Sequence, residues 1–164
     1  MNNPLLIFPL MLKARRPSRL TDMPAVRNAF WLKKGYVALT FFGTVLTHSQ
    51  EEAERINSHY DELKNHEMIH LHQARATHDS WLCFYALYLW YWLKGLPYNR
   101  HMKNAAYQLN PFEMEAYRHM YDMSYLQRLP EGKADEWRRF AKMKMAERHR
   151  LFLAKNDDFE IIDG

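Results

Sequence analysis

The chain has 164 residues, of which 48% are hydrophobic and 15% aromatic, and its formal net charge is +4. This composition excludes a mainly disordered chain, and the length suits one domain better than two. Basic and acidic residues are interspersed without a basic stripe, so we expect no nucleic-acid partner. The single cysteine, Cys83, excludes an internal disulfide, and the N-terminus lacks the charge order of a secretory signal. We therefore expect a cytoplasmic protein.

We expect one domain over residues 1–164, with residues 1–20 as a peripheral arm and residues 156–164 as a peripheral tail.

The first part of the chain predicts a small sheet. Residues 29–47 are dense in β-branched and aromatic side chains and are interrupted by Gly35 and Gly43, which is typical of short strands. The predicted strands cover residues 29–32, 36–42 and 44–47.

Helical patterns follow the predicted strands. Ser49 and Glu52 have the spacing of a capping box, which predicts that a helix begins there. Further helices are predicted over residues 61–77, 80–94, 111–129 and 134–154, the third of them stopped by Pro130. Strands followed by helices indicate an α+β fold, in which a small N-terminal twisted sheet precedes a mostly helical bundle.

The helix predicted over residues 61–77 carries the segment His66-Glu67-Met68-Ile69-His70. His66 and His70 are four positions apart on one helix face, so both imidazoles can reach one metal ion. Glu67 lies about 100° further around the helix. There its carboxylate can flank the metal and accept a proton from a water at the metal. This is the mechanics of an H-E-x-x-H motif, and it makes Glu67 the catalytic candidate.

A catalytic zinc needs a third protein ligand and an open position. The helix that begins at Asn110-Pro111 offers Glu113 and Glu115. If Asn110 is the N-cap, Glu113 is the third helical residue and completes a capping box, which gives it a structural role. Glu115 points about 200° away from Glu113 around the helix. We therefore expect Glu115 to be the third ligand and keep Glu113 as the alternative.

These motifs resemble those of the gluzincin branch of the zincin metallopeptidases, whose third ligand is a glutamate on a second helix. Residues 65–73 and 110–117 more closely resemble small, largely uncharacterised bacterial zincin-like proteins with H-E-x-x-H-x-x-Q followed by F-E-x-E-A-Y. The resemblance covers about residues 43–122. It implies a zincin-like fold, a Zn²⁺ cofactor and a peptide or protein substrate. It also implies that the strand at residues 43–47 is a sheet edge able to hold an extended peptide.

Four further residues are candidates for lining or supporting the site. Gln73 shares the face of the two histidines, and Tyr117 is a candidate for stabilising the transition state. His119 stands where the related pattern has an aspartate, four residues after the glutamate ligand. Asp122 is placed to accept a hydrogen bond from a ligating imidazole. Each of these residues is also explained by an ordinary packing or surface role.

The sequence therefore predicts a zinc metallopeptidase, a hydrolase that cuts a peptide bond with Glu67 as the general base. The alternative is a catalytically silent module that keeps the zincin fold in order to bind a partner or a membrane surface. The apolar, aromatic run at residues 81–93 is too short to span a bilayer. Its tryptophans and tyrosines permit a peripheral membrane contact.

Overall fold

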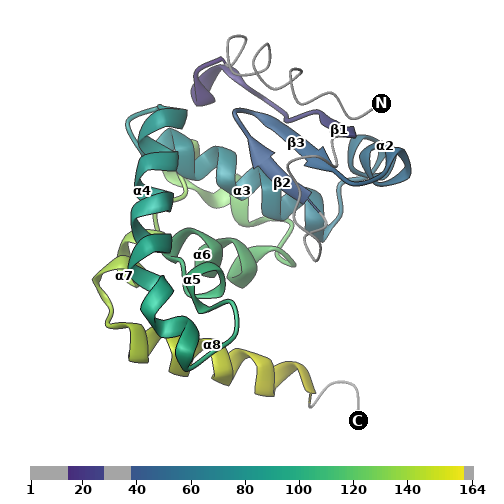
Figure 1. Ribbon diagram of the computed structural model, residues 1–164. Helices are drawn as coiled ribbons and strands as arrows, with labels where there is room; N and C mark the ends of the chain where they lie inside the picture. Colours follow the sequence, from purple (N-terminus) through teal and green to yellow (C-terminus); the bar gives the residue numbers. More distant parts are fainter. Residues whose placement is uncertain (1–14, 28–37, 161–164) are drawn as a thin grey trace.

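The computed structural model describes residues 15–27 and 38–160, with residues 155–160 described by their backbone alone (Figure 1). Its sheet places β3 (Thr44–Thr47) between β1 (Ala25–Arg27), which is parallel to it, and β2 (Ala38–Phe41), which is antiparallel. All four residues of β3 are buried, as expected of a central strand. The prediction of a strand at residues 44–47 is confirmed.

The predicted edge position of residues 43–47 is wrong, because β3 is paired on both sides. The strand expected at residues 29–32 and the start of the one expected at 36–42 lie outside the described residues. β1 was not predicted, since three residues are too few to show an alternating pattern.

After the 3₁₀ helix η2 (Pro17–Arg19) and the sheet, the first described α-helix is α2 (Gln50–Ser58), which packs against β1 and β3. Ser49 and Glu52 form the predicted capping box, in which each side chain accepts from the other residue's backbone N–H. The side chain of Asn57 makes two hydrogen bonds to the backbone of Ala25. Its oxygen accepts from the N–H of Ala25 at 2.8 Å, and its amide nitrogen donates to the carbonyl of Ala25 at 2.9 Å. This pairing attaches the helix to the edge of the sheet.

The helix that carries the histidines, α3 (Glu62–Ala76), crosses the middle of the molecule (Figure 1). It confirms the helix predicted over residues 61–77, with Asp61 as its N-cap. Every residue from Lys64 to Ala74 is buried, polar side chains included. Because a buried polar group is costly without a hydrogen bond, each of these polar side chains needs a partner.

The aromatic helix α4 (Trp81–Gly95) lies on one flank of the molecule and also confirms its prediction (Figure 1). The 3₁₀ helix η3 (Leu96–Arg100) and the short α5 (Ala105–Gln108) fold back against its C-terminal end. Gly95 permits this close approach, because a Cβ at that position would lie 2.6 Å from the Cα of Ala106.

The next helix, α6 (Pro111–His119), begins where predicted but is ten residues shorter than the expected 111–129. Asn65 on α3 explains its end. Its side-chain amide donates to the carbonyls of His119, Met120 and Asp122, which a continuing helix would use for its own hydrogen bonds. The chain continues through two 3₁₀ turns, η4 (Tyr125–Arg128) and η5 (Pro130–Gly132).

The helix predicted over residues 134–154 is two helices, α7 (Trp137–Lys142) and α8 (Met145–Glu160). The break at Met143 is held by the buried guanidinium of Arg148. It donates to the carbonyls of Phe140 at 2.8 Å, Ala141 at 3.2 Å and Leu109 at 3.2 Å. A tertiary contact thus ends α7, and no Pro or Gly marks the position.

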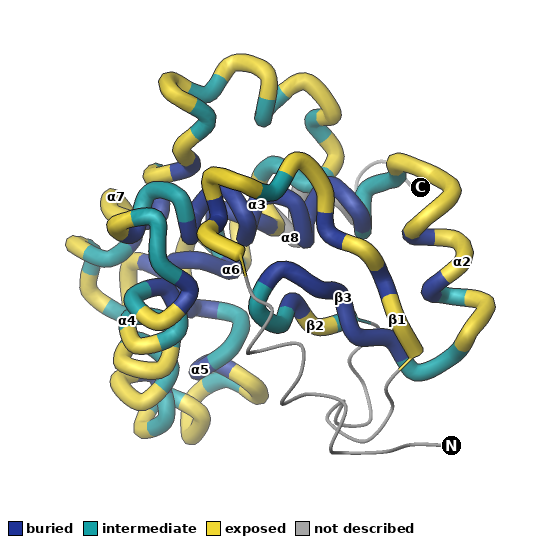
Figure 2. The backbone as a smooth tube through the Cα atoms, turned by 90° about the horizontal axis from the view of Figure 1, so that it is seen from above, coloured by how far each residue is buried: buried dark blue, intermediate teal, exposed yellow. Residues whose placement is uncertain are grey.

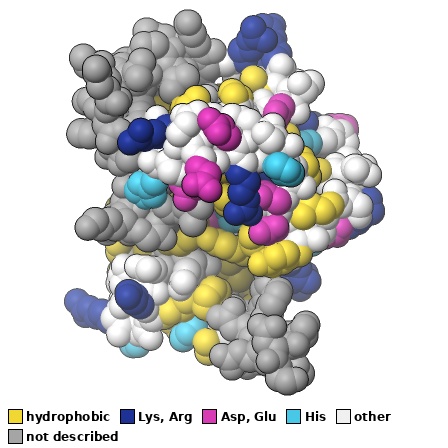
Figure 3. All heavy atoms as spheres, turned by 90° about the vertical axis from the view of Figure 1, so that its right-hand side faces the viewer, with side chains coloured by type: hydrophobic (Ala, Val, Ile, Leu, Met, Phe, Trp, Pro, Cys, Tyr) yellow, Lys and Arg dark blue, Asp and Glu magenta, His cyan; other side chains and the backbone are white. Residues whose placement is uncertain are grey.

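The α+β class is confirmed: a three-stranded sheet precedes helices that make up most of the described residues. Figure 2 shows buried backbone concentrated in β3, α3 and α6, and exposed backbone along α2 and the outer side of α4. On the face shown in Figure 3, acidic and basic side chains are interspersed. Among the described residues, no helix combines the length and the apolar character that crossing a bilayer requires.

Candidate metal centre

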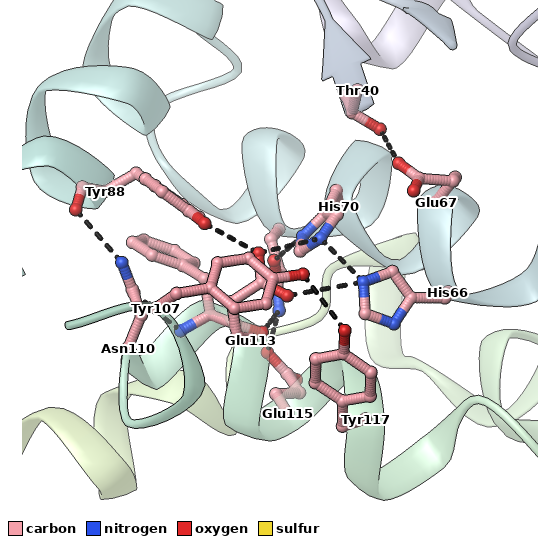
Figure 4. Close-up of polar contacts among 12 residues, drawn as sticks. Thr40, His66, Glu67, His70, Tyr88, Tyr107, Asn110, Glu113, Glu115 and Tyr117 are labelled. Carbon is pink, nitrogen blue, oxygen red and sulfur yellow. Dashed lines mark hydrogen bonds and ion pairs between the residues drawn. The ribbon is translucent and has the colours of Figure 1, made fainter. Parts of the chain in front are cut away.

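Three buried side chains from two helices converge at the centre of the molecule: His66 and His70 of α3 and Glu113 of α6 (Figure 4). The two imidazole Nε2 atoms are 3.2 Å apart. Glu113 Oε2 lies 3.4 Å from His66 Nε2, and Oε1 lies 3.6 Å from His70 Nε2. The three residues are between 3% and 5% exposed, so their mutual approach occurs away from bulk water.

Gln73 determines which nitrogen of His70 faces this cluster. The amide nitrogen of Gln73 donates to the carbonyl of Phe112 at 3.0 Å and to Glu115 Oε2 at 2.8 Å. Its oxygen is therefore the atom that meets His70 Nδ1, at 2.8 Å. Since Nδ1–H donates to this oxygen, the lone pair of a neutral His70 lies on Nε2 and points toward Glu113.

Glu115, the expected third ligand, is held elsewhere. Its Oε1 accepts from the Tyr125 hydroxyl at 2.8 Å and from the backbone N–H of Glu136 at 2.9 Å. Its Oε2 accepts from Gln73 and from the backbone N–H of Trp137 at 3.2 Å. Burial raises its pKa, while these four donors favour the charged form. Glu115 thus joins α6 to the start of α7 and orients Gln73, and the structure corrects its expected place beside the histidines.

The alternative residue, Glu113, takes that place. The expected capping box is absent at this helix start, because Asn110 caps through the N–H of Phe112 and the Glu113 side chain turns inward. The Tyr88 hydroxyl of α4 donates to Glu113 Oε1 at 2.7 Å. Burial opposes ionisation, but the two imidazoles and this hydroxyl outweigh it and lower the pKa of Glu113 to about 2. The group is a carboxylate at neutral pH.

These distances can be compared with those of a bound ion. Zinc at about 2.0–2.1 Å from nitrogen and oxygen ligands in tetrahedral geometry separates its ligands by roughly 3.3–3.4 Å. The observed separations of 3.2, 3.4 and 3.6 Å lie close to this spacing, and the last two end on different oxygens of Glu113. Two imidazoles and one carboxylate are also a donor set that suits zinc. The residues present therefore fit the metal that the motif implies.

Glu67 points away from the three converging side chains, toward the sheet (Figure 4). The hydroxyl of Thr40 on β2 donates to Glu67 Oε2 in a short hydrogen bond, and both residues are buried. The carbonyl of Thr40 accepts in turn from the hydroxyl of Tyr85 at 3.0 Å. Glu67 is therefore fixed between α3 and β2, on the helix turn that carries His66 but outside the cluster of ligand atoms.

No family model, no curated protein and no solved structure matches the chain. Neither the fold family nor the activity is therefore assigned by comparison, and the chemistry rests on the residues themselves.

The other residues singled out in the sequence divide into two groups. Tyr117 lies beside the site: its ring meets that of His66 edge to face at 4.6 Å, and its hydroxyl is 3.0 Å from that of Tyr107 (Figure 4). His119 lies outside, paired with Glu136 at 2.5 Å and stacked on a tyrosine of η4. Asp122 also lies outside, on the surface, where Arg128 and Ser124 hold its carboxylate and lower its pKa to about 2.

Sequence reasoning missed three residues that organise the site: Thr40, Tyr88 and Asn65. Thr40 and Tyr88 belong to segments whose composition explained them as strand and core residues. The side chain of Asn65 precedes the motif directly and lies at 0% exposure. A buried amide next to a metal-binding motif would have been a signal, but burial is visible only in the structure.

Proposed function

We propose that this protein is a zinc-dependent hydrolase that cuts peptide bonds, with His66, His70 and Glu113 as the zinc ligands. The observation that carries the proposal is the convergence of three buried side chains that can each ligate a metal, whose nearest nitrogen and oxygen atoms lie 3.2–3.6 Å apart. Two imidazoles and a carboxylate so close together and shielded from water are stable only with protons or a cation between them. The hydrogen bond from His70 Nδ1 to Gln73 leaves Nε2 ready to bind a cation.

The chain's own residues supply the remaining functions. When bound, zinc would polarise a substrate carbonyl and increase the acidity of a water. Glu67 is the proposed general base; its carboxylate is hydrogen-bonded to Thr40 and faces the sheet, so this role requires the side chain to turn toward the cluster. Tyr117, in contact with His66 and 36% exposed, is the candidate for a hydrogen bond to a substrate oxygen. A structural zinc site has no need of a base, so the presence of Glu67 supports an enzyme.

Elemental analysis of the purified protein tests the metal site. We expect about one zinc per chain, lost in the His66→Ala/His70→Ala variant. A His59→Ala/His101→Ala variant removes two exposed histidines and serves as the matched control, which should retain its zinc. Absence of zinc from the wild-type protein, even after zinc is offered at neutral pH, would overturn the proposal.

Turnover of a peptide library tests the chemistry separately. Glu67→Gln should keep its zinc and lose about 10²–10⁴-fold in rate, which is the usual contribution of a general base. Glu51→Gln, on the exposed face of α2, is the control and should retain full activity. If the wild-type protein binds zinc but cleaves no peptide in the library, the alternative of a silent zincin-like binding module gains support.

A further inference from the structure

The outer face of α4 is apolar over its whole length. Its exposed side chains recur at helical spacing, so they form one stripe: Leu82, Ala86, Leu89, Trp90 and Leu93. Leu82 is 69% exposed and Trp90 54%, and the stripe extends roughly 16 Å along the helix axis. Figure 2 shows this side of α4 turned away from the remaining helices. An exposed face of this kind marks an interaction surface.

From residue 80 to residue 112 the chain carries basic charges alone. Residues 80–112 contain no Asp or Glu, whereas Lys94, Arg100 and Lys103 are exposed within them. The contact between Gly95 and Ala106 holds the segment with Arg100 and Lys103 against the C-terminal end of α4. The apolar stripe thus ends in a cationic segment, in contrast to the mixed charges on the face shown in Figure 3.

The contact between Lys94 and Trp90 also fits an interface between water and apolar chains. The ammonium group of Lys94 lies 4.8 Å from the centre of the Trp90 ring. The lysine stem can therefore follow the apolar face while its charge stays at the level of polar groups. Tryptophan and lysine side by side at the edge of an apolar helix face are typical of residues at lipid headgroups.

We propose that α4 binds the surface of an anionic lipid bilayer, with the stripe in the acyl–headgroup boundary and Lys94, Arg100 and Lys103 on the lipid phosphates. Charge complementarity indicates this binding partner. The apolar face is bordered by cations, and residues 80–112 contain no acidic residue, so the surface matches negatively charged lipid. The interaction is independent of zinc, so it and the proposed hydrolase activity can fail separately.

Co-sedimentation with vesicles tests this proposal. The full-length protein should bind vesicles of phosphatidylcholine mixed with phosphatidylserine, bind phosphatidylcholine alone more weakly, and dissociate as salt is raised. Leu89→Glu/Leu93→Glu should abolish binding. The matched control is Leu151→Glu/Leu153→Glu, which places the same charges on exposed leucines of α8 and should bind as the wild type does.

A second pair of variants tests the cationic segment. Replacing Lys94, Arg100 and Lys103 with Gln should weaken binding by roughly fivefold per charge. Replacing the exposed Arg19, Arg27 and Arg150 with Gln removes the same charge elsewhere and should have a smaller effect. Equal losses in the two triple variants would show attraction by net charge alone and would overturn the docking role of α4.

Two further readouts complete the test. If Leu89→Glu/Leu93→Glu does not fold, a second measurement tests the contact of α4 with the bilayer. Brominated phosphatidylcholine in the anionic vesicles should quench the tryptophan fluorescence of the wild-type protein. The quenching should be clearly weaker in Trp90→Phe. Undiminished quenching in Trp90→Phe would contradict the proposal. So would a wild-type protein that ignores anionic vesicles but forms a dimer that the stripe variant abolishes, because the face would then bind a second copy of the chain.

Discussion

Replacing Glu113 and Glu115 with Gln, one at a time, is the sharpest perturbation of the site. The two residues are close in sequence but make different contacts in the structure. In Glu115→Gln, one carboxylate oxygen becomes an NH₂ group. Each oxygen of Glu115 accepts from two donors, so two buried donors would then face another donor. At about 1–3 kcal/mol for each of the two unsatisfied buried groups, the free energy of unfolding should fall by about 2–6 kcal/mol.

Glu113→Gln should behave in the opposite way. The amide keeps an oxygen for the hydrogen bond from Tyr88 and can turn its nitrogen toward the lone pairs of the imidazoles. The free energy of unfolding of the metal-free protein should therefore change by less than about 1 kcal/mol. Zinc affinity, in contrast, should fall by well over tenfold, because a charged ligand is lost.

Urea unfolding in the presence of a chelator measures the first quantity, and competition with a chelating dye measures the second. The two variants should differ in both quantities. Metal-free Glu115→Gln should be less stable than the wild type, whereas Glu113→Gln should be as stable as the wild type but bind zinc weakly. A stable Glu115→Gln that has lost its zinc, together with a Glu113→Gln that retains it, would refute the assignment and restore Glu115 as the ligand.

Three other changes follow from the same structure. Gln73→Leu removes the acceptor for His70 Nδ1 and should weaken zinc binding by about 10–100-fold in a chelator competition; unchanged affinity would show that Gln73 does not orient the ligand. Burial, with the charge of Arg75, lowers the pKa of His72 from 6.5 to about 4. The stability that neutral His72 contributes is therefore complete above pH 6.5 and is lost as the pH falls toward 4, by up to about 3 kcal/mol in urea titrations. His72→Gln should remove that part of the pH dependence, and an identical profile would contradict it. Gly95→Ala brings a Cβ to 2.6 Å from the Cα of Ala106 and should lower the unfolding free energy by about 1–3 kcal/mol, whereas an unchanged value would show that α5 moves freely.

Local signals in the sequence were sufficient wherever the cause of a structural feature is itself local. The capping pair Ser49 and Glu52 marked the start of α2, and the motif helix and the aromatic helix followed from their composition and bounding residues. His66 and His70 converge because a spacing of four places them on one helix face.

Features with a distant cause could not be found in this way. α6 ends at His119 because Asn65, on another helix, takes the carbonyls that would extend it. α7 ends because the guanidinium of Arg148 donates to the carbonyls of Phe140 and Ala141. Neither partner is a helix breaker, so no propensity marks either position.

The sequence could not show which glutamate lies beside the histidines, for the same reason. A capping box is a local pattern, and it gave Glu113 a structural role that Asn110 fulfils through Phe112 instead. The four donors to Glu115 come from Gln73, Tyr125 and the start of α7, and these are brought together only by the fold. A helical angle of about 200° correctly placed the two carboxylates on opposite sides of α6. It could not show which side faces the histidines.

Anomalous diffraction at the zinc absorption edge, from crystals of the zinc-loaded protein, tests the central claim most directly. We predict one peak bounded by His66 Nε2, His70 Nε2 and the carboxylate of Glu113, with Glu115 still bound to Gln73. A peak on Glu115, or no peak among these side chains in a protein that contains zinc, would contradict the proposed metal centre.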